Sequence, residues 1–254
     1  MPHVRYEVRD RVAEIVLDRP PVNALSLELI EAVIAAFRRA GADDAVRAVL
    51  LTSAREKVFC AGLDLDVVRG KPGREMRVFL ERLYVEYSDV QYRLGKPSIA
   101  AVAGAARAGG MTLAVSCDMI VAGEAATFGY PEIDVGIIPA IHFVLLPKII
   151  GRHRAFELLF GGKPFSAARA ESLGLINRVV PTGDVLTEAR ALAQEMAGKA
   201  PSVMRFGRNA FHRANALDLH RSIEDVADAL AAVAELPEAQ EGLTAFVEKR
   251  KPRW

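Results

Sequence analysis

The sequence lacks three features that mark whole classes of protein: a strong net charge, many cysteines and a long hydrophobic run. The formal net charge of the 254 residues is +1, so neither nucleic acid nor an anionic membrane is expected as the main partner. The two cysteines, Cys60 and Cys117, do not have the number or spacing of a zinc motif. Both neighbour small or apolar residues, so we expect buried thiols in a reduced compartment.

No hydrophobic run approaches the ~18 residues that a membrane-spanning helix requires. The first ten residues, MPHVRYEVRD, carry charges and contain no apolar signal core. We therefore expect a cytoplasmic protein that does not have a membrane as its partner. With 51% hydrophobic and 26% charged residues, the chain has enough apolar side chains to bury a sizeable core.

Strand-like and helix-like segments alternate up to Gly136, which is typical of α/β folds, and the rest of the chain is mostly helical. The change of character near Pro181 predicts an α/β core over residues 1–181 and a helical region over residues 182–254. The expected strands are 4–8, 12–17, 47–53, 98–102, 118–122, 127–129 and 175–180. The expected helices are 26–41, with Ser26 as its N-cap, and 73–94, 108–116, 141–150, 154–160, 167–173, 184–198, 202–217, 219–236 and 237–249.

Two short segments, FCAGLDL at residues 59–65 and GAARAGG at residues 104–110, place small residues where a strand should be followed by a helix. Small residues there let backbone N–H groups approach a ligand closely. Two such groups that converge on one oxygen form an oxyanion hole. Further along, YPEIDVGIIP at residues 130–139 contains a carboxylate, Glu132. An oxyanion site with one acid/base carboxylate suits chemistry on an enolate.

These segments and their order resemble the crotonase superfamily, also called the enoyl-CoA hydratase/isomerase family. The resemblance rests on DRPPVNALS at 18–26, VFCAGLDL at 58–65, KPSIAAVAGAARAGG at 96–110, CDMIVAGEAATFGYPEIDVGIIP at 117–139 and GGKPFSAARAESLGLINRVVP at 161–181. It implies a spiral of ββα units with a helical C-terminal region, here residues 182–254, that forms a homotrimer or a dimer of trimers. It also implies an acyl-CoA thioester as the substrate, with coenzyme A present as part of that substrate, no permanently bound cofactor and no metal.

The resemblance assigns roles to residues of this chain. The oxyanion hole is formed by the backbone N–H groups of Leu63 and Gly109, and Glu132 is the catalytic carboxylate. The residues expected to contact the acyl-CoA are Ala61, Gly62, Leu63, Asp64, Leu65 and Gly109. The helix expected over residues 73–94 borders the acyl pocket.

Two departures from the family pattern bear on the reaction. Hydratases of this family use two glutamates, and the position of the first is occupied here by Thr112, which is neither an acid nor a base near neutral pH. The glycine-rich stretch that usually follows the IP dipeptide is replaced by bulky residues at Ile141, His142 and Phe143. We expect this bulk to narrow the acyl site and exclude water. A single carboxylate that moves a proton between two carbons then suffices, as in a double-bond isomerase.

Four further features have alternative interpretations. His142 is either a second acid/base group or a hydrogen-bonded histidine of the pocket wall, which we favour. Asp134, two residues after Glu132, is either a further catalytic candidate or makes a structural hydrogen bond, which we favour. Arg107 either contacts a polar acyl tail or phosphate or lies in a solvated turn, and the cations at residues 249–251 either reach the CoA phosphate or end a solvated helix.

The sequence therefore favours an enoyl-CoA isomerase that uses Glu132. The alternatives are an enoyl-CoA hydratase, an acyl-CoA lyase or thioester hydrolase of the same superfamily, and a non-catalytic protein that binds acyl-CoA or RNA. The intact oxyanion segments and Glu132 argue against a non-catalytic protein, and the small net charge argues against RNA.

Overall fold

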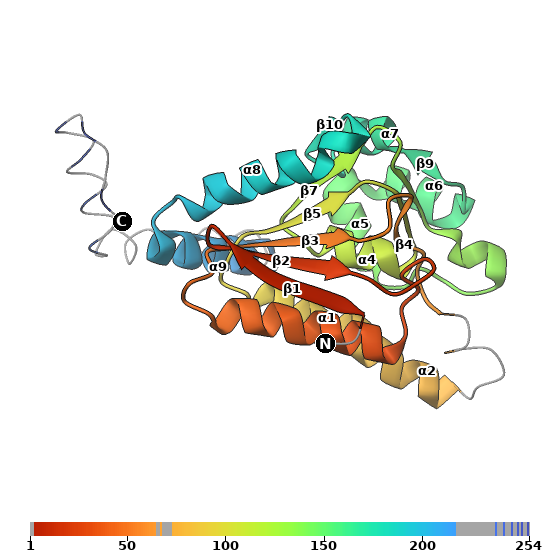
Figure 1. Ribbon diagram of the computed structural model, residues 1–254. Coiled ribbons are helices and arrows are strands. Elements are labelled where there is room, and N and C mark those ends of the chain that lie inside the picture. Colours follow the sequence, from red (N-terminus) through yellow and green to blue (C-terminus); the bar gives the residue numbers. More distant parts are fainter. Residues whose placement is uncertain are drawn as a thin grey trace.

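The computed structural model describes residues 3–64, 67 and 73–216, and isolated positions at 237, 241, 245, 248, 250 and 253. A six-stranded sheet, ordered β1-β2-β3-β5-β7-β10, runs through its centre. Only β1 is antiparallel to its neighbour, so the sheet is otherwise parallel (Figure 1). Its strands are β1 (Val4–Arg9), β2 (Val12–Leu17), β3 (Ala48–Ser53), β5 (Ser98–Val102), β7 (Met119–Gly123) and β10 (Arg178–Val180).

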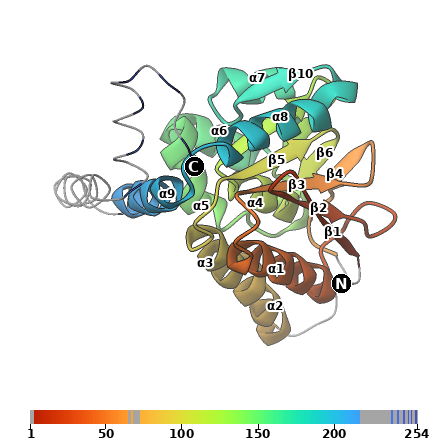
Figure 2. The same cartoon turned by 60° about the vertical axis from the view of Figure 1, so that its left-hand side comes forward.

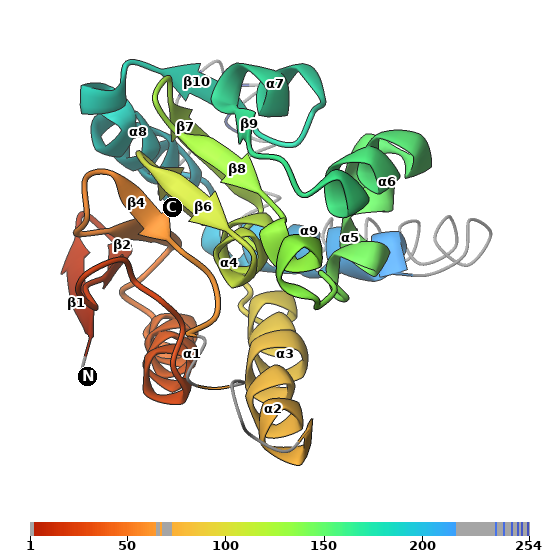
Figure 3. The same cartoon turned by 90° about the vertical axis from the view of Figure 1, so that its right-hand side faces the viewer.

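A smaller sheet lies beside the first and has the order β4-β6-β8-β9 (Figure 3). Its strands are β4 (Val58–Cys60), β6 (Ala105–Arg107), β8 (Thr127–Gly129) and β9 (Phe165–Ser166). The mixed α/β architecture with repeated strand-strand-helix units agrees with the fold class expected from the sequence. The sequence analysis did not predict β4, β6 or β9 as strands, because two or three residues are too few to show an alternating pattern.

Helices cover both faces of the six-stranded sheet (Figure 1). One face packs against α1 (Leu27–Ala42), and the other packs against α8 (Val185–Ala197), which follows the η4 turn (Thr182–Asp184). The central strand β5 is buried along its whole length, as expected for a parallel strand covered on both sides. The sequence-predicted start of α1 is confirmed, since the Ser26 side chain accepts a hydrogen bond from the Leu29 N–H.

The single helix predicted over residues 73–94 is instead three segments. They are α2 (Gly73–Leu80), a π-helical turn η2 (Glu81–Glu86) and α3 (Tyr87–Tyr92). This run lies beside α1, where the rings of Phe37 and Tyr87 meet edge to face with 5.7 Å between their centroids (Figure 2). The π-helical turn was not predicted from the sequence.

The remaining helices are α4 (Gly109–Val115), η3 (Pro131–Val135), α5 (His142–Ile150), α6 (Arg152–Gly161), α7 (Ala167–Ser172) and α9 (Pro201–Ala216). α9 is held to the core by Arg208 and His212, which both contact the Asp118 carboxylate, at 2.8 and 2.9 Å. The strand predicted at 175–180 begins only at Arg178, because Gly174 and Leu175 close the end of α7 with backbone hydrogen bonds. The helices predicted at 219–236 and 237–249 lie outside the continuous part of the chain that the structure describes, so the trimerising region stays a prediction.

Candidate active site

The segment after β4, residues 61–64, is held in place by backbone hydrogen bonds to Leu25. The Leu25 N–H donates to the carbonyl oxygen of Gly62 at 2.7 Å, and the Asp64 N–H donates to the carbonyl oxygen of Leu25 at 3.0 Å. Neighbouring peptide groups of an extended segment point to opposite sides, so the N–H of Leu63 points away from Leu25. The sequence predicted that a helix would follow directly, but residues 61–64 are instead an irregular extended segment.

The second glycine-rich segment does lead into a helix, and its turn is strained. Ala108 has φ 49° and ψ −117°, a conformation that costs a residue with a Cβ about 1–3 kcal/mol. Its N–H donates to the carbonyl oxygen of Gly129 at 3.1 Å, and its own carbonyl accepts from Thr112 N–H, which fixes the first turn of α4. Gly109 is therefore presented as the first residue of α4, with its N–H directed out of the helix end.

The two segments are in direct contact. A Cβ added to Gly62, whose φ is +96°, would lie 2.7 Å from the Cβ of Ala108 and 3.5 Å from the Gly109 nitrogen. A Cβ added to Gly110 would lie 2.4 Å from the carbonyl oxygen of Cys60. Glycine is needed at both positions because neither backbone contact leaves room for a side chain. Within the described residues, the N–H groups of Leu63 and Gly109 make no hydrogen bond, so both are available to a ligand.

Glu132 lies across from these groups on the 3₁₀ turn η3. Its carbonyl accepts from Ile137 N–H at 3.0 Å, and Gly136 ends the turn in the left-handed conformation. The side chain is 8% exposed, and its Oε2 has no hydrogen-bond partner. Burial raises the pKa of the Glu132 carboxyl from 4.5 to about 7. A carboxyl with this pKa both releases and accepts a proton near neutral pH.

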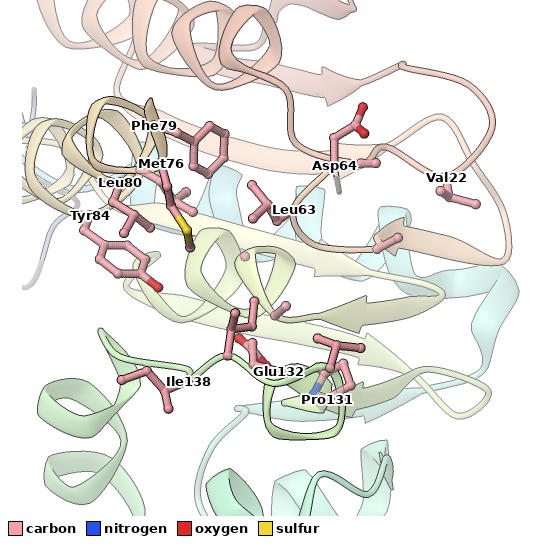
Figure 4. A pocket seen from close by; sticks show the side chains of 17 residues that line it. Val22, Leu63, Asp64, Met76, Phe79, Leu80, Tyr84, Pro131, Glu132 and Ile138 are labelled. Atoms are coloured by element: carbon pink, nitrogen blue, oxygen red, sulfur yellow. The ribbon is translucent and has the colours of Figure 1, made fainter. Parts of the chain in front are cut away.

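A cavity of about 480 Å³ connects Leu63, Gly109 and Glu132 (Figure 4). Figure 4 shows Val22 at one end of it and Tyr84 and Ile138 at the other, with Glu132 between them. Small side chains line the part that includes the oxyanion segments: Val22, Ala24, Ala61, Ala108 and Gly109. Larger side chains line the rest, chiefly Met76, Phe79, Leu80, Leu83, Tyr84, Val135, Ile137 and Ile138. The prediction that residues 73–94 border the pocket is confirmed for this cavity. Tyr84 and Val22 were not predicted individually as lining residues.

The predicted effect of the bulky segment on the cavity is wrong. Ile141, His142 and Phe143 do not line it. Phe143 is 38% exposed and stacks on Phe160, with ring centroids 5.5 Å apart, because α5 turns its side chain outward. The wall is formed instead by Ile137 and Ile138, which precede α5.

Thr112 and His142 form a buried pair behind the cavity wall. Thr112 Oγ1 and His142 Nε2 are 3.2 Å apart, and both residues are 1% exposed. Burial lowers the pKa of His142 to about 3, so its imidazole is neutral. The expected hydrogen bond of His142 is therefore present, but the residue does not reach the cavity. The Thr112 hydroxyl therefore forms its hydrogen bond with His142.

The other candidate residues take structural positions. Asp64 lines the cavity but forms an ion pair with Arg19 at 2.7 Å. Arg107 is half-buried and does not line the cavity, and its guanidinium donates to the backbone carbonyl and hydroxyl of Thr127. The Asp134 carboxylate packs against Gly162, outside the cavity, and its structural hydrogen bond stays a prediction.

Some of the predicted residues lie outside the part of the chain that the structure describes. Leu65 and the lysines at 249 and 251 lie outside the described residues. Arg250 is described and contacts Glu241 at 2.6 Å. Cys60 and Cys117 are buried free thiols, as predicted. Within the described part of the chain, no group of three or more potential ligand side chains could hold a metal ion, and no helix is long and apolar enough to cross a membrane.

Comparison with known proteins assigns this chain to one family. The sequence profile of the family described as Enoyl-CoA hydratase/isomerase matches residues 7–254. The crystal structure of an enoyl-CoA hydratase from Mycobacterium smegmatis is similar at a TM-score of 0.94 and 34% identity, covering 100% of this chain and 99% of that one. An enoyl-CoA isomerase/hydratase of Mycosarcoma maydis is 34% identical over 251 residues, which is 95% of this chain and 91% of the relative. A Dictyostelium discoideum protein named "Probable enoyl-CoA hydratase, mitochondrial" is 34% identical over 98% of this chain and 89% of its own length.

Proposed function

We propose that this chain, which belongs to the enoyl-CoA hydratase/isomerase family, is an acyl-CoA enzyme. Its main reaction is the β,γ to α,β shift of an enoyl-CoA double bond. The observation that carries the proposal is that a buried carboxylate, Glu132, whose Oε2 makes no hydrogen bond, shares a largely apolar cavity with two free backbone N–H groups. No second carboxylate faces Glu132 from the position of Thr112, whose hydroxyl is bonded to His142.

The proposed reaction uses Glu132 twice, first as the base and then as the acid. The N–H groups of Leu63 and Gly109 donate to the thioester oxygen, which stabilises the negative charge that develops there. The Glu132 carboxylate removes a proton from the α carbon of a 3-enoyl-CoA, and the electron pair of that C–H bond forms the dienolate. The dienolate then takes the same proton from the Glu132 carboxyl at its γ carbon, which leaves the double bond between the α and β carbons. The mostly apolar chamber keeps water away from the intermediate.

Hydration is the second candidate, and the names of the relatives favour it, since several are called enoyl-CoA hydratases. A hydratase must activate a water molecule and protonate carbon in the same site. Here Glu132 would have to perform both steps alone, because Thr112 supplies no acid or base. The Mycosarcoma maydis relative carries both activities in its name.

A panel of acyl-CoAs separates these reactions by mass. Isomerisation of a 3-enoyl-CoA conserves mass, hydration of a 2-enoyl-CoA adds one water, and thioester hydrolysis releases free CoA. We expect 3-enoyl-CoAs to be isomerised faster than 2-enoyl-CoAs are hydrated. Rapid hydration of crotonyl-CoA without isomerisation of any 3-enoyl-CoA would favour the hydratase, and binding without any product would indicate a non-catalytic protein.

The assembly and the requirement for cofactors follow from the same proposal. We expect a homotrimer or a dimer of trimers, built with the region 182–254, and no cofactor besides the CoA of the substrate. Light scattering of the full-length protein would give the mass of the particle, and activity after exhaustive dialysis against a chelator would test the requirement for a metal. The cytoplasmic location expected from the sequence also stays a prediction.

A further inference from the structure

Polar side chains are few in the lining of this cavity. Three of its lining side chains carry a charge or a hydroxyl: Asp64, Tyr84 and Glu132. Asp64 is held by Arg19. Glu132 is the carboxylate of the proposed reaction, which leaves the hydroxyl of Tyr84 without an assigned role.

Tyr84 extends from η2 toward the side of the cavity where Glu132 and Ile138 lie (Figure 4). Its helix departs from α geometry over the six residues Glu81–Glu86, and π-helical turns of this kind are rare and frequent at functional sites. Leu83 and Tyr84 are adjacent in this turn, and both line the cavity. The hydroxyl is therefore built into the chamber wall rather than exposed on the outer face of the helix.

The surroundings of the hydroxyl leave its hydrogen available. Tyr84 and Glu132 line the same cavity, and both burial and the negative charge of Glu132 raise the pKa of the Tyr84 hydroxyl. The backbone of Ile141 acts in the opposite direction, which identifies its N–H as the donor and the Tyr84 oxygen as the acceptor. No group in the described part of the chain accepts the hydroxyl hydrogen in turn.

The position of Tyr84 along the cavity indicates which part of a substrate it would meet. Val22 lies at the opposite end, and Leu63 and Glu132 lie between the two (Figure 4). The part lined by small residues includes Leu63 and Gly109, where the proposed reaction places the thioester oxygen. An acyl chain whose thioester oxygen lies at Leu63 and Gly109, and whose α carbon faces Glu132, then continues toward Tyr84.

We propose that the Tyr84 hydroxyl donates a hydrogen bond to an oxygen on the acyl chain beyond the reacting carbons, so that the enzyme prefers acyl-CoAs with a hydroxyl or carbonyl there over plain alkyl thioesters. The inference rests on the proposed function. An alkyl chain at this point covers a donor that has no acceptor, whereas an oxygenated chain satisfies it. One neutral hydrogen bond of this kind corresponds to a preference of about 3–10-fold.

The test measures binding of saturated thioesters, which can be neither isomerised nor hydrated. Dissociation constants of hexanoyl-CoA and of its 4-, 5- and 6-hydroxy derivatives are compared for the wild type, Tyr84→Phe and Tyr6→Phe. Tyr6 is a control because its hydroxyl is buried, makes no hydrogen bond and lies outside the cavity. We expect at least one hydroxy derivative to bind about 3–10-fold more tightly than hexanoyl-CoA. Tyr84→Phe should abolish this preference, and Tyr6→Phe should retain it.

The outcomes separate this inference from the proposed function. If wild type binds hexanoyl-CoA and all the hydroxy derivatives equally, or if Tyr84→Phe keeps the preference, the inference is wrong while the acyl-CoA site stands. A purely structural role for Tyr84 would weaken all the thioesters by the same factor in Tyr84→Phe, which would also overturn it. If no thioester binds to the wild type, the proposed function and the inference fail together.

Discussion

The two walls of the cavity are built in different ways. The wall formed by residues 61–64 and 108–110 presents backbone N–H groups, and its geometry depends on the small volume of Gly62 and Gly110. The opposite wall, residues 131–138, presents side chains, among which Glu132 is the only one with a charge. The first wall is fixed by main-chain packing, whereas the second depends on which side chain stands at each position.

A wall made of backbone groups can be the same in every member of a family, whereas a wall made of side chains can differ between members. A backbone oxyanion hole stabilises any thioester enolate, whatever happens to the α proton afterwards. The fate of the enolate depends on which acid or base lies opposite, and a substitution such as Thr112 for a carboxylate changes it without disturbing the backbone. The four predictions below test whether the two walls act in this independent way.

The largest loss is expected from the side-chain wall, in Glu132→Gln. The amide keeps the size of the side chain but cannot take up the α proton, so kcat should fall by roughly 10²–10⁴-fold. Binding of a saturated acyl-CoA should persist, because the oxyanion wall is untouched. Steady-state kinetics together with titration calorimetry would check both parts. A variant that turns over within about threefold of the wild type would remove Glu132 from the reaction.

The backbone wall is tested by comparing Gly109→Pro with Gly109→Ala. Both add a Cβ, which would lie 2.7 Å from Leu25 Cδ1 and 3.3 Å from Leu83 Cδ2, at the movable ends of those side chains. Only proline removes the N–H. The ratio of the two rates therefore isolates the hydrogen bond, and we expect the proline variant to be slower on the order of 10²-fold. Equal rates would mean that the Gly109 N–H does not bind the oxyanion. A complex with an acyl-CoA should show both N–H nitrogens within about 3.2 Å of the thioester oxygen.

The raised pKa of Glu132 predicts opposite pH trends for rate and stability. In the proposed reaction the carboxylate is the base, so kcat/KM should fall roughly tenfold per pH unit below about 7. The folded protein keeps this proton between pH 4.5 and about 7, where the unfolded chain has released it. The contribution of Glu132 to stability is therefore full below 4.5 and is lost as the pH rises to about 7. Melting temperatures of the wild type and Glu132→Gln across this range would show it, since the glutamine variant should lack this slope. A rate that stays constant down to pH 5 would show that the carboxyl is not the base.

The sequence predicted the backbone wall better than the side-chain wall. Gly62 and Gly110 are required by close contacts with Ala108 and with the backbone of Cys60, so the motif itself carries the geometry. The strands β2, β5 and β8 were predicted with the observed bounds, whereas β4, β6 and β9 were missed. The position of residues 141–143 was predicted incorrectly, because where α5 begins decides which side chains turn outward. Tyr84 could not be found from sequence, because it becomes a cavity residue only when η2 packs against the segment around Glu132.

The smallest effect on rate is expected from Thr112→Val, which tests whether the pair behind the side-chain wall takes part in the chemistry. Valine keeps the shape of threonine but leaves His142 Nε2 buried without its partner, which should destabilise the fold by about 1–3 kcal/mol. Isomerisation should stay within about threefold of the wild type, because neither Thr112 nor His142 lines the cavity. Thr112→Ser is the matched control, since it keeps the hydroxyl and should recover much of the stability. Chemical denaturation and initial rates on a 3-enoyl-CoA would measure the two effects. A contrary result would be a stable Thr112→Val protein whose rate has fallen more than tenfold, while Thr112→Ser retains activity. The hydroxyl would then act in the reaction, for example by holding a water, and the hydratase would be the better assignment.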